Sequence, residues 1–412
     1  MKSPRFSQTT EQRSVLGRRE FLRRGIAASV GTLGLAAPAD ADDGPRVRQF
    51  RNLGRTGMKI SDISMGTSRT IDPAVVRHAF ERGINYFDTA ESYHDGASER
   101  AVGDALAKHR NRIFIATKII ARPTDRRARL MRNLEDSLKR LQTDHVDVYF
   151  NHAVNDLARL ENTEWHELTR LAKQQGKIRF SGMSGHGGHL IRCLDYALDN
   201  DLVDVVLAAY NFGQDPKFYE RFTRSFDLVA NQQGLPRVLE KATAKGVGVI
   251  AMKTLMGGRL NDLGPYRWPG GSTAQAAFRW TLSNPHVDAL IVSMVKPKQI
   301  DRYLGASGRA SIGYRERRQL REYTEQNSDS YCRPGCDACA DSCPVKVPIA
   351  DVLRARMYKL DYRDDRLASD AYAKLGAGAS PCLECAEAVC QSACPYGLRI
   401  GDLARSTARI LG

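Results

Sequence analysis

The sequence has little that would place the protein in a membrane or on nucleic acid. No run of about 18 uncharged apolar residues occurs, which excludes a multi-pass membrane protein and predicts no integral segment in the mature chain. The net charge is +15, but no basic stripe is interleaved with aromatic residues, so we expect no nucleic-acid partner. Because 42% of the 412 residues are hydrophobic and 26% are charged, collagen-like, low-complexity and largely disordered chains are excluded.

Residues 1–41 have the pattern of an export signal. The paired Arg18 and Arg19 precede Phe21, a small-residue apolar stretch spans 25–37, and small residues at 37–41 fit a signal peptidase site. Paired arginines indicate the twin-arginine machinery, which exports folded proteins. We therefore predict an exported, periplasmic protein. A disordered basic tail is the alternative.

The middle of the chain alternates between expected strands and helices. The near-continuous apolar strands indicate burial on both faces, as in a parallel sheet. The expected strands are 60–67, 85–90, 112–118, 145–152, 178–185, 203–211, 247–253 and 289–295. The expected helices are 72–83, 98–109, 126–142, 164–176, 189–200, 236–245, 273–284 and 297–305, with an irregular insert at 212–234.

Eight such units predict an α/β fold, a (β/α)8 TIM barrel over residues 45–328. An open, doubly wound sheet is the alternative. It would need a glycine-rich phosphate turn after the first strand, and the sequence at 64–67 is not one.

Four titratable side chains lie at the ends of three successive strands. Asp88 ends the second strand and Tyr93 follows five residues later, while Lys118 and His152 end the third and fourth strands. In a barrel these ends meet at one opening, where the chemistry is located. A lysine after a buried run needs a partner, and Asp88 on the adjacent strand can provide one.

The chemistry of these groups is matched. An ammonium beside a phenol stabilises the phenolate, so we expect Lys118 to lower the pKa of Tyr93. Tyr93 then becomes a usable general acid, and His152 can orient a carbonyl oxygen.

Residues 47–305 resemble the aldo/keto reductase family. The similarity is carried by segment 83–93, which contains Asp88 and Tyr93, and by segments 53–57 and 176–184. The resemblance implies an oxidoreductase (EC 1.1.1.-) that uses NADP(H) to reduce a small carbonyl or oxidise an alcohol. The residues that it makes catalytic are Asp88, Tyr93, Lys118 and His152. Those that it makes cofactor-binding are Gly66, Thr67, Ser184, Met252 and Lys253.

Several positions depart from the family pattern. Gly185 replaces an asparagine, Leu207 replaces a glutamine, and Met252 replaces the aromatic residue that stacks under nicotinamide. Segment 293–303, which would hold the adenosine phosphate, also matches poorly. Catalysis is therefore better supported than tight NADPH binding.

Eight of the nine cysteines lie after residue 331, and the ninth, Cys193, is expected in a helix core. They form two groups, each ending in Cys-Pro: Cys332, Cys336, Cys339 and Cys343, then Cys382, Cys385, Cys390 and Cys394. The bacterial ferredoxin run ends in the same way, with its fourth cysteine serving the other cluster. We predict a small helical, ferredoxin-type domain at 329–412 with one or two 4Fe-4S clusters as metal sites. Disulfides and structural zinc are the alternatives.

Together these features resemble a subgroup of aldo/keto reductases with a twin-arginine signal and a ferredoxin-type extension. Two function classes remain. The first is a reductase whose clusters exchange electrons with a redox partner. The second is an exported electron-transfer or partner-binding protein that uses the barrel as a scaffold.

Overall fold

The structure is a computed structural model that describes residues 44–215, 234–256 and 271–412. The predicted signal at 1–41 and most of the predicted insert lie outside these ranges. Pro45–Gly412 form one compact unit, which contains both the barrel and the cysteine-bearing residues. The domain boundary near residue 328 stays a prediction.

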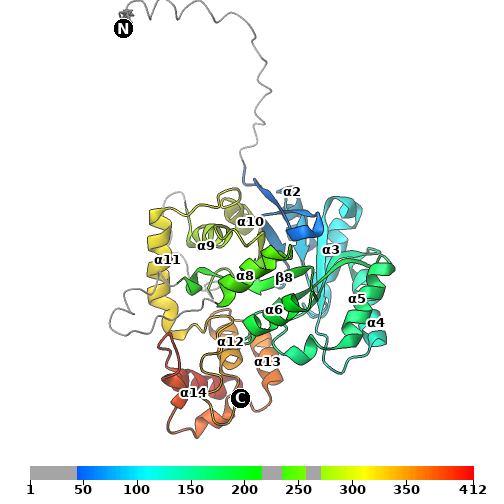
Figure 1. Ribbon diagram of the computed structural model, residues 1–412. Coiled ribbons are helices and arrows are strands. Elements are labelled where there is room, and N and C mark those ends of the chain that lie inside the picture. Colours follow the sequence, from blue (N-terminus) through cyan, green and yellow to red (C-terminus); the bar gives the residue numbers. More distant parts are fainter. Residues whose placement is uncertain (1–43, 216–233, 257–270) are drawn as a thin grey trace, which may run out of the picture. The chain divides into compact units, whose positions relative to one another are not determined.

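Eight parallel strands close into a barrel in chain order, with the last pairing with the first (Figure 1). They are β3 (Ile63–Gly66), β4 (Tyr86–Asp88), β5 (Phe114–Ile119), β6 (Val146–Asn151), β7 (Ile178–Gly185), β8 (Val205–Ala209), β9 (Gly248–Met252) and β10 (Ala289–Ser293). The predicted (β/α)8 barrel is confirmed, and the open-sheet alternative is wrong.

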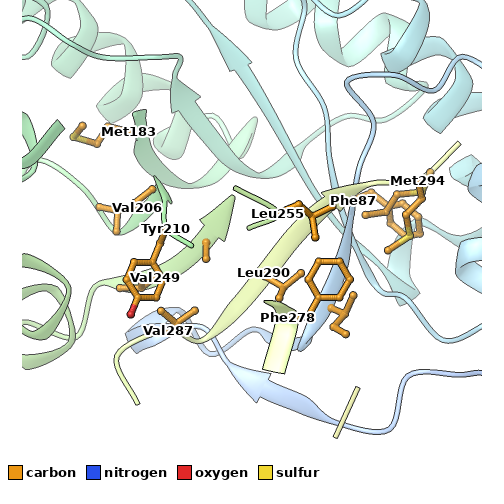
Figure 2. Packing of buried hydrophobic residues seen from close by; sticks show 14 of the residues in the cluster. Phe87, Met183, Val206, Tyr210, Val249, Leu255, Phe278, Val287, Leu290 and Met294 are labelled. Carbon is orange, nitrogen blue, oxygen red and sulfur yellow. The ribbon is translucent and has the colours of Figure 1, made fainter. Parts of the chain in front are cut away.

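Helices follow the strands and cover the outside of the barrel. They are α2 (Pro73–Glu81), α3 (Ala97–Leu106), α4 (Arg127–Leu141), α5 (Thr163–Gln174), α6 (Leu190–Asp199), α8 (Gly234–Ala244), α9 (Thr273–Leu282) and α10 (Pro297–Leu304). In α4, for example, Leu130, Leu134, Leu138 and Leu141 recur at helical spacing and are buried. Figure 2 shows part of the apolar layer between strands and helices, including Leu290 of β10 and Phe278 of α9.

A hairpin precedes the barrel and fills its interior at one end. Strands β1 (Phe50–Asn52) and β2 (Lys59–Ser61) pair antiparallel, and Leu53 between them packs with residues from the barrel interior. Gly54 has a φ of +47°, and a Cβ there would lie 2.4 Å from the Gly248 nitrogen. Only glycine fits this contact. The hairpin therefore leaves the opposite end, where the strands finish, for a site.

The expected strand at 60–67 is two strands, because Asp62 interrupts it. The buried carboxylate accepts the backbone N–H of Ile63 at 2.9 Å, the hydroxyl of Ser307 at 2.6 Å and the backbone N–H of Gly308 at 2.8 Å. These bonds satisfy a charged group that burial would otherwise penalise. They also tie the start of β3 to the turn after α10.

Four further helices follow the barrel: α11 (Tyr314–Asn327), α12 (Ile349–Leu360), α13 (Asp365–Tyr372) and α14 (Ile400–Leu411) (Figure 1). We call residues 329–412 the cysteine segment. It has a hydrophobic core of its own, in which Val352, Leu398 and Ala404 are buried beside the thiols. Within the described ranges, none of the helices is long and apolar enough to cross a bilayer.

Candidate active site

The four predicted catalytic residues lie at one end of neighbouring strands. Asp88 is the last residue of β4, Lys118 lies in β5, and His152 directly follows β6. Tyr93 lies in the turn after β4, just before His94 and Asp95, whose φ values are positive. Because β4, β5 and β6 are adjacent, the strand register brings these side chains together as predicted.

A buried ion pair anchors the site. The Nζ of Lys118 donates to Asp88 Oδ1 at 2.5 Å and to the carbonyl oxygen of Thr89 at 2.6 Å, and each charged side chain is 1% exposed. Burial lowers the pKa of Lys118, but Asp88 and Tyr93 raise it by more. The net shift is upward, so the lysine stays protonated at neutral pH.

Tyr93 lies between the ammonium and the imidazole. The Nζ of Lys118 is 5.0 Å from the centroid of its ring, and the His152 ring meets it edge-on at 5.6 Å. Burial raises the pKa of Tyr93 by more than Lys118 lowers it. The expectation of a lowered pKa was therefore wrong for the net shift, because desolvation of the phenolate outweighs the attraction of the ammonium. Tyr93 keeps its proton and remains a potential proton donor.

His152 is held as a neutral imidazole. Burial lowers its pKa well below the usual value, and Lys118, Arg159, Lys374 and Lys253 lower it further. Its Nδ1 is buried and has no hydrogen-bond partner within the described residues. A neutral ring in this position can donate a hydrogen bond to an oxygen atom without carrying a charge.

A pocket adjoins these groups, with an empty volume of about 680 Å³ that includes its open mouth. Asp88 and Tyr93 line it, as do Gly66, Met252 and Lys253 from the predicted cofactor set. Two members of that set have other contacts. The Thr67 hydroxyl donates to the Asp88 carbonyl oxygen at 3.1 Å, and the Ser184 hydroxyl accepts the Ala153 N–H at 2.9 Å.

Two departures from the family pattern have physical reasons. A Cβ on Gly185 would lie 2.5 Å from Leu190 Cδ1 and 3.2 Å from the Val154 carbonyl oxygen, so a side chain there would require Leu190 to move. Leu207 pairs in register with Ser184 and packs in the barrel interior, where it offers no hydrogen bond. Neither position offers a side-chain hydrogen bond to a carboxamide.

Sequence reasoning missed three tyrosines and an asparagine near the pocket. Tyr303 of α10 and Tyr362, just after α12, line it. Asn211, after β8, donates from Nδ2 to the Lys253 carbonyl oxygen at 3.0 Å and to the Tyr331 hydroxyl at 2.9 Å. The weak resemblance at 293–303 hid Tyr303, and no local pattern marks Tyr331 or Tyr362, which reach the barrel from the cysteine segment.

The cysteines are arranged around two places in the cysteine segment. None of the nine, all of which lie in the described residues, forms a disulfide. One cavity is lined by Cys332, Cys336, Cys339 and Cys394, and we call these the first cysteine site. The fourth member comes from the second sequence group. Burial raises the pKa of the Cys339 thiol to about 12, and the thiols of Cys336, Cys394 and Cys390 add to the shift.

The remaining cysteines form the second cysteine site: Cys343, Cys382, Cys385 and Cys390. Burial and then the thiols of Cys343, Cys390 and Cys385 raise the pKa of Cys382. Within residues 44–215, 234–256 and 271–412, no three His, Cys, Asp or Glu side chains converge closely enough for a single metal ion. The cavity of the first cysteine site is lined by three cysteines of the first sequence group and by Cys394, the last cysteine of the second group, which is the kind of crossover found in two-cluster ferredoxins.

Comparisons with known proteins agree with the barrel. The sequence pattern of the aldo/keto reductase family matches residues 57–264. L-galactose dehydrogenase of Arabidopsis thaliana is 28% identical over 299 residues, covering 63% of this chain and 88% of that protein. A putative aldo-keto reductase from Pseudomonas aeruginosa has a TM-score of 0.50 at 26% identity, covering 64% of this chain and 98% of its own.

A third comparison concerns the fold alone. An aldo-keto reductase from Klebsiella pneumoniae, solved in complex with NADPH, has a TM-score of 0.52 at 23% identity and covers 68% of this chain and 96% of its own. The family match ends at residue 264, so the cysteine segment lies beyond it. The matched half of the sequence, the closed barrel and the four converging side chains lead to one conclusion: the chain belongs to the aldo/keto reductase family of oxidoreductases.

Proposed function

We propose that the protein transfers hydride between NADP(H) and a small carbonyl or alcohol, with Tyr93 as the acid. The observation that carries this proposal is the convergence of Lys118, Asp88, Tyr93 and His152 at one end of the barrel beside the pocket. NADPH, when bound, supplies the hydride that the carbonyl carbon accepts.

The residues of the chain supply the proton and the geometry. Tyr93 holds a proton on its hydroxyl and gives it to the carbonyl oxygen as the carbon accepts hydride. Lys118 stabilises the phenolate that remains, and Asp88 keeps the ammonium in place at 2.5 Å. His152, neutral because of its burial, directs an N–H toward the same oxygen. Oxidation of an alcohol uses the same groups in reverse.

The donor set of the pocket fits a dinucleotide. Gly66 has no side chain at the end of β3, which leaves its backbone open to a flat ring, and the thioether of Met252 can cover a nicotinamide face. Lys253 adds a positive charge to the same pocket. These are the residues that we expect to hold NADP(H).

Replacing Tyr93 with phenylalanine tests the proposal. The variant keeps the ring but lacks the proton, so NADPH-dependent reduction of 4-nitrobenzaldehyde should fall by at least about 100-fold. NADPH binding, followed by fluorescence, should remain. Unchanged turnover in Tyr93→Phe would overturn the assignment.

We further propose that the two cysteine sites hold one or two 4Fe-4S clusters, which exchange single electrons with a redox partner. Three observations support the clusters. Four cysteines line one cavity, one of them is Cys394 from the second sequence group, and each sequence group ends in Cys-Pro. The predicted twin-arginine signal agrees with this proposal, since a cluster assembled in the cytoplasm has to be exported inside a folded protein. We therefore propose a periplasmic location.

One observation favours a second function. Gly185 and Leu207 offer no side-chain polar group to the carboxamide of a nicotinamide, and the hydroxyl of Ser184, which accepts the Ala153 N–H, is left with its O–H as the donor. A barrel with weakened dinucleotide contacts fits an exported electron-transfer or partner-binding protein. Exported protein that is loaded with iron but free of dinucleotide would support this alternative.

A further inference from the structure

The two ends of helix α12 in the cysteine segment have different packing partners. Near its start, Ile349 and Leu353 line the cavity of the first cysteine site. Near its end, Met357 and Tyr358 belong to the same hydrophobic core as the barrel strands and their helices. Leu353 and Tyr358 are about 7.5 Å apart along the helix axis. One short helix therefore contacts both the cysteine site and the barrel.

Tyr358 and Tyr362 contact the cleft through Lys253. The Nζ of Lys253 donates to the Tyr358 hydroxyl at 3.0 Å. It lies 4.9 Å from the centroid of the Tyr358 ring and 5.9 Å from that of Tyr362. The two rings pack on each other at 5.5 Å. Tyr362 itself lines the pocket, together with Met252 and Tyr93. The ammonium is thus held against two aromatic faces that come from the cysteine segment.

The backbone of Lys253 is linked to the same segment through Asn211. Its φ of +56° is unusual for a residue with a side chain, and such conformations persist only where the surroundings enforce them. Asn211 donates to its carbonyl oxygen at 3.0 Å and also to the hydroxyl of Tyr331, the residue before Cys332, at 2.9 Å. Lys253 is therefore connected to the cysteine segment directly through its side chain and, by way of Asn211, through its backbone.

We propose that Tyr362, which lines the pocket, and Tyr358, which contacts the Lys253 ammonium, hold Lys253 over the bound nicotinamide dinucleotide and slow its release. The cysteine segment is then part of the reductase pocket as well as the site of the cysteines. This inference rests on the proposed function, because it assumes that the cleft takes NADP(H).

The test measures the rate of NADPH release from the full-length protein by stopped-flow displacement. Tyr362→Leu removes a pocket ring, and Lys253→Met removes the charge held by both rings. Each should accelerate release by about tenfold, the scale of one lost aromatic or cation contact. Tyr358→Phe, which removes only the hydroxyl that accepts from Lys253, should accelerate release by a smaller factor.

Tyr372→Phe is the matched control. Tyr372 is a buried tyrosine of the same segment, and its hydroxyl accepts the Ala379 N–H at 2.9 Å, but it does not line the pocket. Release from this variant should stay within about twofold of the parent rate. Iron content and circular dichroism, matched across the variants, show that the segment is folded.

The outcomes separate the two proposals. If the parent protein releases NADPH slowly and Tyr362→Leu, Lys253→Met and Tyr358→Phe all leave the rate unchanged, the inference is overturned and the proposed function stands. Equal acceleration in Tyr372→Phe also overturns the inference, because general loosening of the segment then explains the effect. A parent protein that binds neither NADPH nor NADH overturns both. Should Tyr362→Leu not fold, the nearly isosteric Tyr358→Phe decides.

Discussion

The barrel mouth and the cysteine segment hold their reactive groups in different ways. At the mouth, the strand register places Lys118 and Asp88, and a 2.5 Å hydrogen bond between fully buried groups joins them. In the cysteine segment, short turns and helix ends carry the thiols, and Cys385 is exposed. Sheet packing alone brings the groups at the mouth together, although His152 Nδ1 has no hydrogen-bond partner within the described residues. Thiols on short turns need a bound group to hold them together.

The first prediction tests whether the buried ion pair anchors the site at the barrel mouth, and it has the largest expected effect. Lys118→Met leaves Asp88 buried without its partner, which should lower the free energy of unfolding by about 3–5 kcal/mol and abolish turnover. Urea unfolding and NADPH oxidation measure the two effects.

The double variant Asp88→Asn/Lys118→Met is the control for this prediction. It removes both charges, so most of the lost stability should return while turnover stays absent. If the single variant proves as stable as the parent protein, the ion pair does not anchor the site.

The second prediction concerns the cysteine sites. Anaerobically prepared protein should hold about eight irons, and about four would mean that only one site is loaded. Iron removal by a chelator should reduce hydrogen-exchange protection in α14 by about 100-fold, or about 2.7 kcal/mol, while β5 and β6 keep theirs. The barrel-facing end of α12 should also stay protected, because Tyr358 packs in the barrel core.

Two results would contradict this view of the cysteine segment. Iron-free protein whose thiols resist alkylation until they are reduced would indicate disulfides. Zinc in place of iron, at about one ion per site, would indicate a structural metal. In either case the barrel mouth and the cysteine segment would still hold their reactive groups in different ways, but the proposed electron transfer would be wrong.

The third prediction uses pH and has the smallest effect. His152 and His186 have pKa values well below the usual value, first because of burial and then because of nearby cations that include Lys253. The unfolded chain takes up protons near pH 6.5 while the folded barrel does not, so stability should decrease as pH falls below about 6.5. The slope should reach about 1.4 kcal/mol per pH unit for each histidine.

The histidine content separates the two regions in this measurement. Residues 329–412 contain no histidine, so the loss between about pH 6.5 and 5 should come from the barrel. Denaturant unfolding across this range measures it. His152→Asn should reduce the slope, and an unchanged slope in that variant would show that His152 is not buried in its neutral form.

Features that are determined by neighbouring residues in the chain could be predicted from the sequence, whereas features that depend on distant residues could not. The strand ends carry Asp88, Lys118 and His152 because apolar runs define the strands, so the four-residue constellation could be predicted. The strand break at Asp62 could not, because its partners Ser307 and Gly308 lie far along the chain. The direction of the pKa shift of Tyr93 was predicted wrongly, because the sequence does not show how deeply the phenol is buried.

The pocket itself shows the same limit. Gly66 and Lys253 were predicted to bind the cofactor and do line the cleft. Tyr362 is nearly 270 residues away from Tyr93 in the chain, and no motif marks it, so only packing of α12 against the barrel reveals it. The regrouping of Cys394 with the first three cysteines could be expected from the ferredoxin comparison but not from spacing alone.

We propose, as the central point, that hydride chemistry in the barrel is coupled to electron transfer in the cysteine segment. A potential-controlled titration of protein purified from the exported fraction tests it most directly, with dinucleotide and cluster absorbance followed together. The account predicts about one bound dinucleotide per chain, whose redox state follows that of the clusters as the potential changes. Cluster-loaded protein without dinucleotide, or a dinucleotide that stays unchanged while the clusters titrate, would contradict it.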